Sequence, residues 1–275
     1  SLTTPLYIRA VDVPESAEVE EIRALVVESG ETPDGEVLVD DISRWRFDRQ
    51  ISCGFYYRWD WPGGVVDWEW MDSRARWGRH VRAELDQNAC AGYDSPALIS
   101  LAVMRGDAPH LKGAWMRWAA VKDRPAPPVV PVWVDPTWLK RAIDGHQGII
   151  WYESRAVADA LERLGVRTMR AGEQPPSDGQ RVALSVRSHG TGYNLQAWRS
   201  ALVLEPPSGG KAWEQMIGRL HRAGQPHTVT FDVVHTSEAF QAALVSARAD
   251  ARYIEDTTGN HQKLNAAGYQ GEGLT

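Results

Sequence analysis

The chain has 275 residues, which is enough for one large domain or two smaller domains that each bury a core. Its formal net charge is −6, it contains no apolar run long enough to cross a bilayer, and its two cysteines, Cys53 and Cys90, cannot build a disulfide framework or a cysteine-based zinc site. These properties exclude a membrane-spanning or disulfide-stapled protein. We therefore expect a protein without a membrane partner that is cytoplasmic, or nuclear in a eukaryote, and not secreted.

The charge is unevenly distributed along the chain. Residues 1–41 hold eleven acids and two bases, a net charge of −9, whereas the remainder holds 28 bases and 25 acids. This pattern predicts an acidic N-terminal arm on a mildly basic body, which is compatible with a basic groove for nucleic acid.

The first half of the chain is predicted to be mostly helical. The charge and apolar spacing of residues 15–30 predict a surface helix, and residues 36–43 could form a strand that ends in two acids. The following stretch, 44–120, is rich in tryptophan and arginine. Helices are expected within it and just beyond it at 68–85, 95–106 and 111–123, with Ser95-Pro96 as a helix start. The tryptophans either form a core with arginines at its rim, which we favour, or stack on nucleic-acid bases.

The proline-rich segment 124–136 predicts an extended connector and a domain boundary. After it, the pattern alternates between apolar strands and amphipathic helices. Strands are expected at 148–153, 166–170, 181–188, 200–207 and 228–236, and helices at 154–165, with Ser154 as N-cap and Gly165 as its stop, and at 237–256. This alternation predicts an α/β fold at 132–275, a parallel sheet with helices on both faces, preceded by a mostly helical inter-lobe or accessory region at 1–131.

One short segment poses a specific question about function. Residues 214–225, EQMIGRLHRAGQ, predict a helix that ends with Arg219 and Arg222 on one side, just before Gly224 and Pro226. Two cations at a helix C-terminus can simply interact favourably with the helix dipole in solvent. Alternatively, the two guanidinium groups reach a phosphate that another part of the assembly supplies.

Three segments, taken in order, resemble a known family. GIIWYESRAVADAL, ALSVRSHGTGYNLQAW and EQMIGRLHRAGQ look like the fourth, fifth and sixth motifs of superfamily-two helicases, in the branch of SWI/SNF-like DNA translocases. The fifth motif spans Ser185–Leu195 and includes Thr191. The chain matches every fixed position of the sixth motif: Gln215, Gly218, Arg219, His221, Arg222, Gly224 and Gln225.

The resemblance implies a RecA-like second motor lobe, which contributes arginine fingers to an ATP site between two lobes. It implies that Arg222 meets the γ-phosphate, that Arg219 supports it, and that Gln215 lines the same cleft. It also implies a nucleotide-sensing loop at Gly190, Gly192 and Asn194, and nucleic-acid phosphate contacts at Ser185, Arg187 and Ser188. The family's fifth-motif threonine is Val186 here, so its hydroxyl contact is lost unless Ser185 or Ser188 replaces it.

The chain carries no phosphate loop and no convincing Asp-Glu metal motif. We therefore expect it to be the C-terminal part of a longer motor, or one member of a split pair. An N-terminal lobe, in cis or in trans, would hold most of the ATP and Mg²⁺, no metal or cofactor would bind tightly here, and the chain alone would be inactive. Its other expected partner is duplex DNA. The alternative functions are a non-catalytic nucleic-acid or partner-binding module on the same fold, and part of an RNA helicase.

Overall fold

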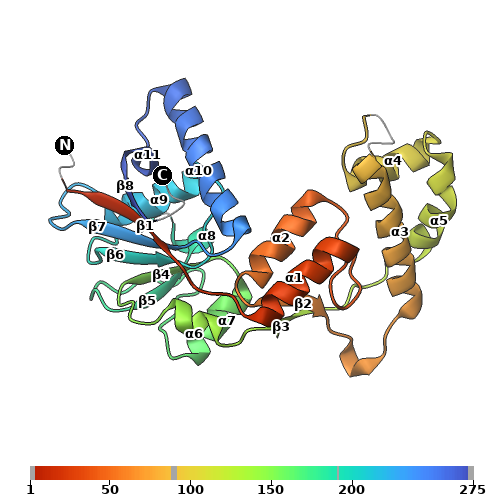
Figure 1. Cartoon of the computed structure of the whole chain (residues 1–275), viewed down its shortest axis with the longest axis horizontal. Coiled ribbons are helices and arrows are strands. Elements are labelled where there is room, and N and C mark those ends of the chain that lie inside the picture. Colours follow the sequence, from red (N-terminus) through yellow and green to blue (C-terminus); the bar gives the residue numbers. More distant parts are fainter. Residues whose placement is uncertain (1–3, 88–91, 191, 272–275) are drawn as a thin grey trace. The chain divides into compact units, whose positions relative to one another are not determined.

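A computed structural model describes residues 4–87, 92–190 and 192–271, which fold into two compact units (Figure 1). Unit 1 contains the segments up to Ser16, Ser52–Gly54 and from Asp135 onward, and unit 2 contains Ala17–Ile51 and Phe55–Val134. Within the described residues, no helix is both long and apolar enough to span a bilayer.

Unit 1 is built on a six-stranded sheet with the order β5-β4-β6-β7-β1-β8, in which every neighbouring pair is parallel. Its strands are β1 (Leu6–Val11), β4 (Ile149–Tyr152), β5 (Val182–Ser185), β6 (Ser200–Val203), β7 (Val229–Val234) and β8 (Gly268–Gln270). All residues of β4 and β5 are buried, as expected for parallel strands that are covered on both faces.

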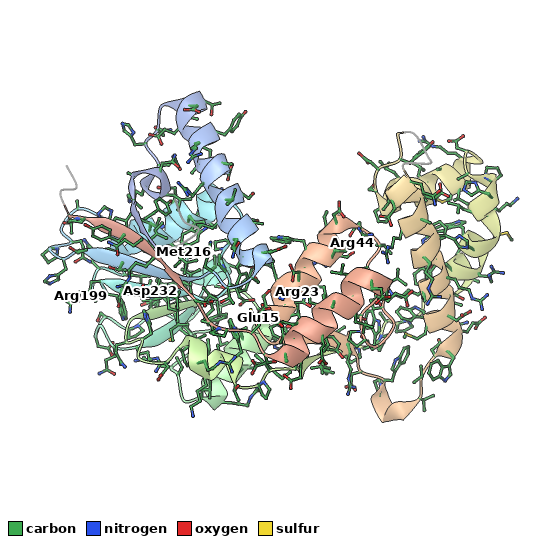
Figure 2. All side chains as sticks on the ribbon, viewed as in Figure 1. Glu15, Arg23, Arg44, Arg199, Met216 and Asp232 are labelled. Atoms are coloured by element: carbon green, nitrogen blue, oxygen red, sulfur yellow. The ribbon has the colours of Figure 1, made fainter. Side chains whose placement is uncertain are left out.

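Helices cover both faces of this sheet. In Figure 1, α6 (Trp138–Ala142) and α7 (Arg155–Arg163) lie on one side, and α9 (Gly210–Leu220), α10 (Glu238–Thr258) and α11 (Lys263–Ala266) lie on the other. Met216 of α9, labelled in Figure 2, is fully buried in the unit 1 core. The predicted fold class is confirmed: unit 1 has the parallel α/β architecture expected of a RecA-like lobe.

Local sequence explains where these helices begin and end. The hydroxyl oxygen of Ser154 accepts a hydrogen bond from the Val157 amide, as predicted for the N-cap of α7, and Ser237 caps α10 in the same way. Gly165 follows α7 with a φ of 76°, a left-handed conformation that favours glycine. The predicted strand at 166–170 forms only an isolated bridge between Thr168 and Ala183.

The N-terminal segment belongs to the sheet, so the expected division at residues 131 and 132 differs from the observed one. The chain passes from unit 2 to unit 1 between Val134 and Asp135, and β1 inserts between β7 and β8. Ile8 is completely buried, and Arg9 donates from Nε to Asp232, labelled in Figure 2, over 2.7 Å. The alternation of buried and exposed side chains in LYIRAV is a strand signal that the N-terminal acidic bias obscured.

Unit 2 is mostly helical. Its elements are α1 (Ala17–Ser29), α2 (Asp41–Ile51), β2 (Phe55–Trp59), η1 (Pro62–Gly64), α3 (Trp68–Gln87), α4 (Pro96–Arg105), η2 (Pro109–Leu111), α5 (Lys112–Val121) and β3 (Val129–Trp133). The surface helix and the three helices predicted in and beyond the tryptophan-rich stretch are confirmed, and Ser95 caps α4 by accepting a hydrogen bond from Leu98. The predicted connector at 124–136 contains β3, which pairs with β2 in an antiparallel ribbon.

The tryptophans of unit 2 form a core with an arginine at its rim. Trp70 and Trp77 are 3% and 7% exposed. The Arg74 guanidinium lies 5.4 Å from the Trp70 ring centroid, close to two further tryptophan rings, and forms an ion pair with Glu36. This confirms the core interpretation for these side chains, whereas Trp68 is 73% exposed.

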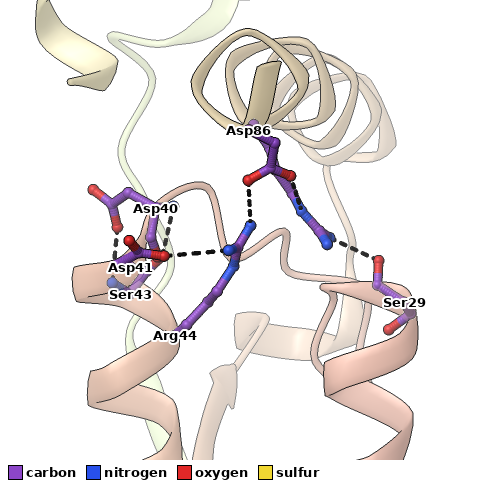
Figure 3. Close-up of polar contacts among 7 residues, drawn as sticks. Ser29, Asp40, Asp41, Ser43, Arg44 and Asp86 are labelled. Atoms are coloured by element: carbon purple, nitrogen blue, oxygen red, sulfur yellow. Dashed lines mark hydrogen bonds and ion pairs between the residues drawn. The ribbon is translucent and has the colours of Figure 1, made fainter. Parts of the chain in front are cut away.

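The acidic N-terminal segment does not form a separate arm, because β1 belongs to the sheet of unit 1 and ion pairs hold the part from Ala17 onward in unit 2. Glu31 pairs with Arg79 of α3 over 2.6 Å. Figure 3 shows a second set of contacts, in which Asp86 of α3 bridges Arg44 of α2 (3.0 Å) and Arg82 (3.3 Å), and Arg82 in turn donates to the Ser29 carbonyl. The possible strand at 36–43 does not form.

Instead, the two acids at its end mark the start of α2. The carboxylate of Asp40 accepts a hydrogen bond from the Ser43 amide over 2.8 Å, and Asp41 forms an ion pair with Arg44 (Figure 3). A carboxylate that receives a first-turn amide satisfies one of the donors that a helix start leaves unpaired. The aspartates therefore have a structural role at the start of α2.

Candidate functional site

The segment after β5 forms a single helical turn, α8 (Val186–His189). Ser185 is 9% exposed, and its hydroxyl oxygen accepts from the Ser188 amide over 3.4 Å, so this predicted nucleic-acid contact acts as an N-cap. Arg187 differs, because its side chain is 79% exposed and forms an ion pair with Glu153 at 3.3 Å. Of the three residues predicted to contact nucleic acid, Arg187 is therefore the most accessible.

The loop that follows α8 is connected to Arg219 on α9. The Arg219 guanidinium donates from Nε to the Gly190 carbonyl over 3.2 Å and from a terminal nitrogen to the Tyr193 carbonyl over 3.4 Å. A Cβ at position 190 would lie 2.6 Å from the Val186 carbonyl oxygen, so only glycine fits there. Thr191 lies outside the described residues. The two hydrogen bonds from Arg219 therefore hold the backbone of the predicted nucleotide-sensing loop at Gly190 and Tyr193.

The outer part of this loop is exposed. Gly192 has a φ of +88°, and the Asn194 side chain accepts from the Gln196 amide over 3.3 Å. Gly192 and Asn194 do not line the pocket formed by Gln215, Arg219 and Arg222, which is described below. Gly190 lies nearer to it, because a Cβ at this position would be 4.0 Å from the side-chain oxygen of Gln215.

Arg219 and Arg222 do not both lie on the helix, which corrects the prediction from spacing. Helix α9 ends at Leu220, so Arg219 lies in its last turn and Arg222 lies in the turn that follows. Gly224 has a φ of +93°, but it belongs to this second turn rather than to the helix cap that was predicted. The helix stops early because His221 leaves the helical conformation and directs its side chain to the N-terminal segment.

The turn that carries Arg222 is anchored on both sides. His221 donates from Nε2 to the Thr4 carbonyl over 2.7 Å, and the Thr4 hydroxyl donates to the Gln225 carbonyl over 2.8 Å. The Gln225 side-chain amide lies 3.2 Å from the carbonyl oxygens of Gln196, Trp198 and Leu220. His221 and Gln225 are both buried, so these two residues of the motif fix the backbone.

Three predicted site residues meet at one pocket. Gln215, Arg219 and Arg222 line an open depression of about 590 Å³, together with Lys211, Glu214, Gly218, Ile254 and Gln262. Arg222 is exposed, and no hydrogen bond or ion pair of its guanidinium is formed within the described ranges. The lining has one carboxylate, Glu214, against three cations, which suits it to an anion.

Sequence reasoning missed the residues that complete this pocket from outside the motifs. Ile254 belongs to α10, and Gln262 belongs to the segment between α10 and α11, for which no element was predicted. Thr4 was also missed. None of these residues carries a recognisable spacing signal, because the tertiary fold brings them to α9 from distant parts of the chain.

Comparison with known proteins adds little to this geometry. No protein-family model matches the chain, and no curated protein does. Among solved structures, the chain is similar to the "C-terminal part of Fun30 ATPase domain", with 13% sequence identity and a TM-score of 0.40, over 94% of this chain and 99% of that one. Because this similarity is low, the assignment of a parallel α/β fold depends on the observed sheet and not on the comparison.

Proposed function

We propose that this chain provides the arginine-bearing lobe of an ATP-driven DNA translocase. The observation that supports this most directly is the anchored turn that presents an exposed, unpaired Arg222 to the same pocket as Arg219 and Gln215. A guanidinium is always charged and binds phosphate oxygens with a planar fork. Because the backbone of the turn is anchored, Arg222 would need little rearrangement when a nucleotide binds.

The reaction would be hydrolysis of ATP to ADP and phosphate, with movement along duplex DNA. Negative charge builds up on the transferred phosphoryl group, and an arginine placed beside it stabilises the transition state. Arg222 would contact that group, and Arg219, held by the Gly190 and Tyr193 carbonyls, would couple the contact to the adjoining loop. The described residues contain no group of three or more potential metal ligands, so we assign Mg²⁺ binding to a partner lobe.

Nucleic acid would bind at the other predicted surface, around α8. Arg187 is exposed there, and its ion pair with Glu153, made through one terminal nitrogen, leaves the rest of the guanidinium available for a backbone phosphate. The buried Ser185 would contribute by holding α8 in place, and Ser188 would lie next to the phosphate contact.

The test is Arg222→Ala in the protein that combines this chain with its phosphate-loop lobe. Arginine fingers contribute about 10³–10⁵ in rate, so steady-state ATPase activity with saturating DNA should fall by roughly that factor. Melting temperature and DNA affinity should hardly change, because Arg222 is exposed and substitutions at such surface positions usually change stability by no more than about 0.5 kcal/mol. Arg222→Lys should not restore turnover, because an ammonium lacks the planar fork.

A control is Arg163→Ala, which removes an exposed arginine from the last turn of α7 without changing the pocket. Its turnover should equal that of the unaltered protein. Near-normal turnover in folded Arg222→Ala protein would instead favour the non-catalytic binding module.

A further inference from the structure

A lysine outside every recognised motif lies beside the two arginines. Lys263 is the first residue of α11, which packs against α9. The Leu264 amide donates to the Glu214 carboxylate of α9 over 2.7 Å, and the Leu264 side chain is completely buried. These two contacts fix the position of the lysine backbone.

The Lys263 ammonium lies against the backbone of α9 at Gly218. A Cβ at position 218 would lie 3.3 Å from the Lys263 Nζ, so a side chain larger than that of glycine would crowd the ammonium group. Gly218 lines the arginine pocket and directly precedes Arg219. Throughout residues 4–87, 92–190 and 192–271, no hydrogen bond or ion pair is formed by Nζ.

The electrostatic surroundings make this ammonium costly in the absence of an anion. Burial lowers the pKa of Lys263 from its usual value, and the charges of Arg222 and Arg219 lower it further, against the raising effect of Glu214. A partly desolvated cation next to two like charges gains much more from an incoming anion than a solvated surface lysine does.

We propose that Lys263 adds a fourth cation to the three that line this pocket, and that it binds the phosphate chain of a nucleotide together with Arg219 and Arg222. The proposal rests on the proposed function and deepens it, because it adds a contact from the C-terminal segment. Arg222 supplies a directional fork, and Arg219 supplies the terminal nitrogen that its bonds to the Gly190 and Tyr193 carbonyls leave over. The ammonium supplies a compact charge whose three protons can turn toward any phosphate oxygen. The ligand class is a polyphosphate anion, from a nucleotide rather than from a nucleic-acid backbone.

The experiment measures binding of inorganic tripolyphosphate to the chain by calorimetry at low ionic strength and millimolar ligand. Lys263→Met keeps the apolar stem and removes the charge, and it should weaken binding about tenfold, as expected for one lost charged hydrogen bond. Lys263→Arg should retain most of the affinity. The control Lys140→Met removes an exposed lysine of α6 and should leave affinity unchanged. Thermal melting checks that each variant is folded.

Two further arms separate the inference from the function beneath it. If Arg222→Ala weakens binding but folded Lys263→Met binds like the unaltered chain, Lys263 has no role and the arginine pocket stands. If the unaltered chain does not bind tripolyphosphate, the role of Lys263 is overturned, whereas the proposed function is decided separately by the turnover of Arg222→Ala in the assembled motor. Competition should show displacement by ATP. Displacement by a short DNA duplex but not by ATP would overturn the assignment to a nucleotide.

Discussion

At the scale of single residues, neighbouring side chains of one motif have different tasks. The side chains of Ser185 and Gln225 form hydrogen bonds with the backbone, whereas those of Arg187 and Arg222 extend into solvent. The sequence does not distinguish these classes, because the same residue type at the same spacing suits both a ligand contact and a cap. Burial distinguishes them: a buried polar group must be satisfied within the protein, and an exposed guanidinium remains available to a ligand.

Arg187 allows a direct test of the proposed DNA surface. Arg187→Ala should weaken binding of a labelled duplex and reduce the slope of log affinity against log salt by about 0.9, because one phosphate contact is lost. Stability should change by no more than about 1 kcal/mol, as is usual for an exposed ion pair. Arg167→Ala is the control, because Arg167 is also exposed and pairs with a carboxylate at 3.7 Å. An unchanged salt slope in Arg187→Ala would remove this residue from the interface.

At the scale of elements, β4, β5, β6 and β7 were predicted because their signals are local, but the strand predicted at 181–188 ends at Ser185, where α8 begins, and the strand predicted at 166–170 did not form. Each of the strands β4 to β7 is a short apolar run, and the N-caps Ser154 and Ser237 mark the starts of α7 and α10. What could not be predicted depends on distant partners. β1 forms as a strand by pairing with β7, which lies far away in the sequence. The early end of α9 likewise depends on the contact of His221 with Thr4. The pocket was predicted only where motif residues line it, at Gln215, Arg219 and Arg222.

The turn after α9 yields a prediction about backbone conformation. Gly224→Ala forces a Cβ onto a residue with a φ of +93°, which should lower stability by about 1–2 kcal/mol. In the assembled motor it should also reduce turnover, because it displaces the backbone that positions Arg222. Gly145→Ala introduces the same kind of strain at a φ of +69° in open space away from the pocket. Both are compared by urea melts and ATPase assays, and an equal loss of turnover in both would argue against a positioning role for the turn.

At the scale of the whole molecule, the two units have separate cores, and β1 assigns the N-terminus to unit 1. Ile8→Ala should destabilise unit 1 by about 2–5 kcal/mol, because it leaves a cavity at a fully buried site in a strand that is paired on both sides. Hydrogen exchange followed by mass spectrometry should show lost protection across residues 135–271. Residues 17–51 and 55–134 should keep theirs, whereas Ile99→Ala in unit 2 should show the reverse. Loss confined to β1 itself would contradict the placement of this strand in the shared core.

The position of β1 also has a consequence for synthesis on the ribosome. Its partner strand β7 lies far along the chain, and the paired side chains Arg9 and Asp232 are 223 residues apart. Unit 2 is complete once Val134 has emerged, but β1 must wait for β7. At about 5–20 residues per second, the hundred residues between these events take roughly 5–20 s. During that interval the nascent chain holds a folded helical unit and an apolar strand with both edges unpaired, which is the stage at which we expect it to need protection from aggregation.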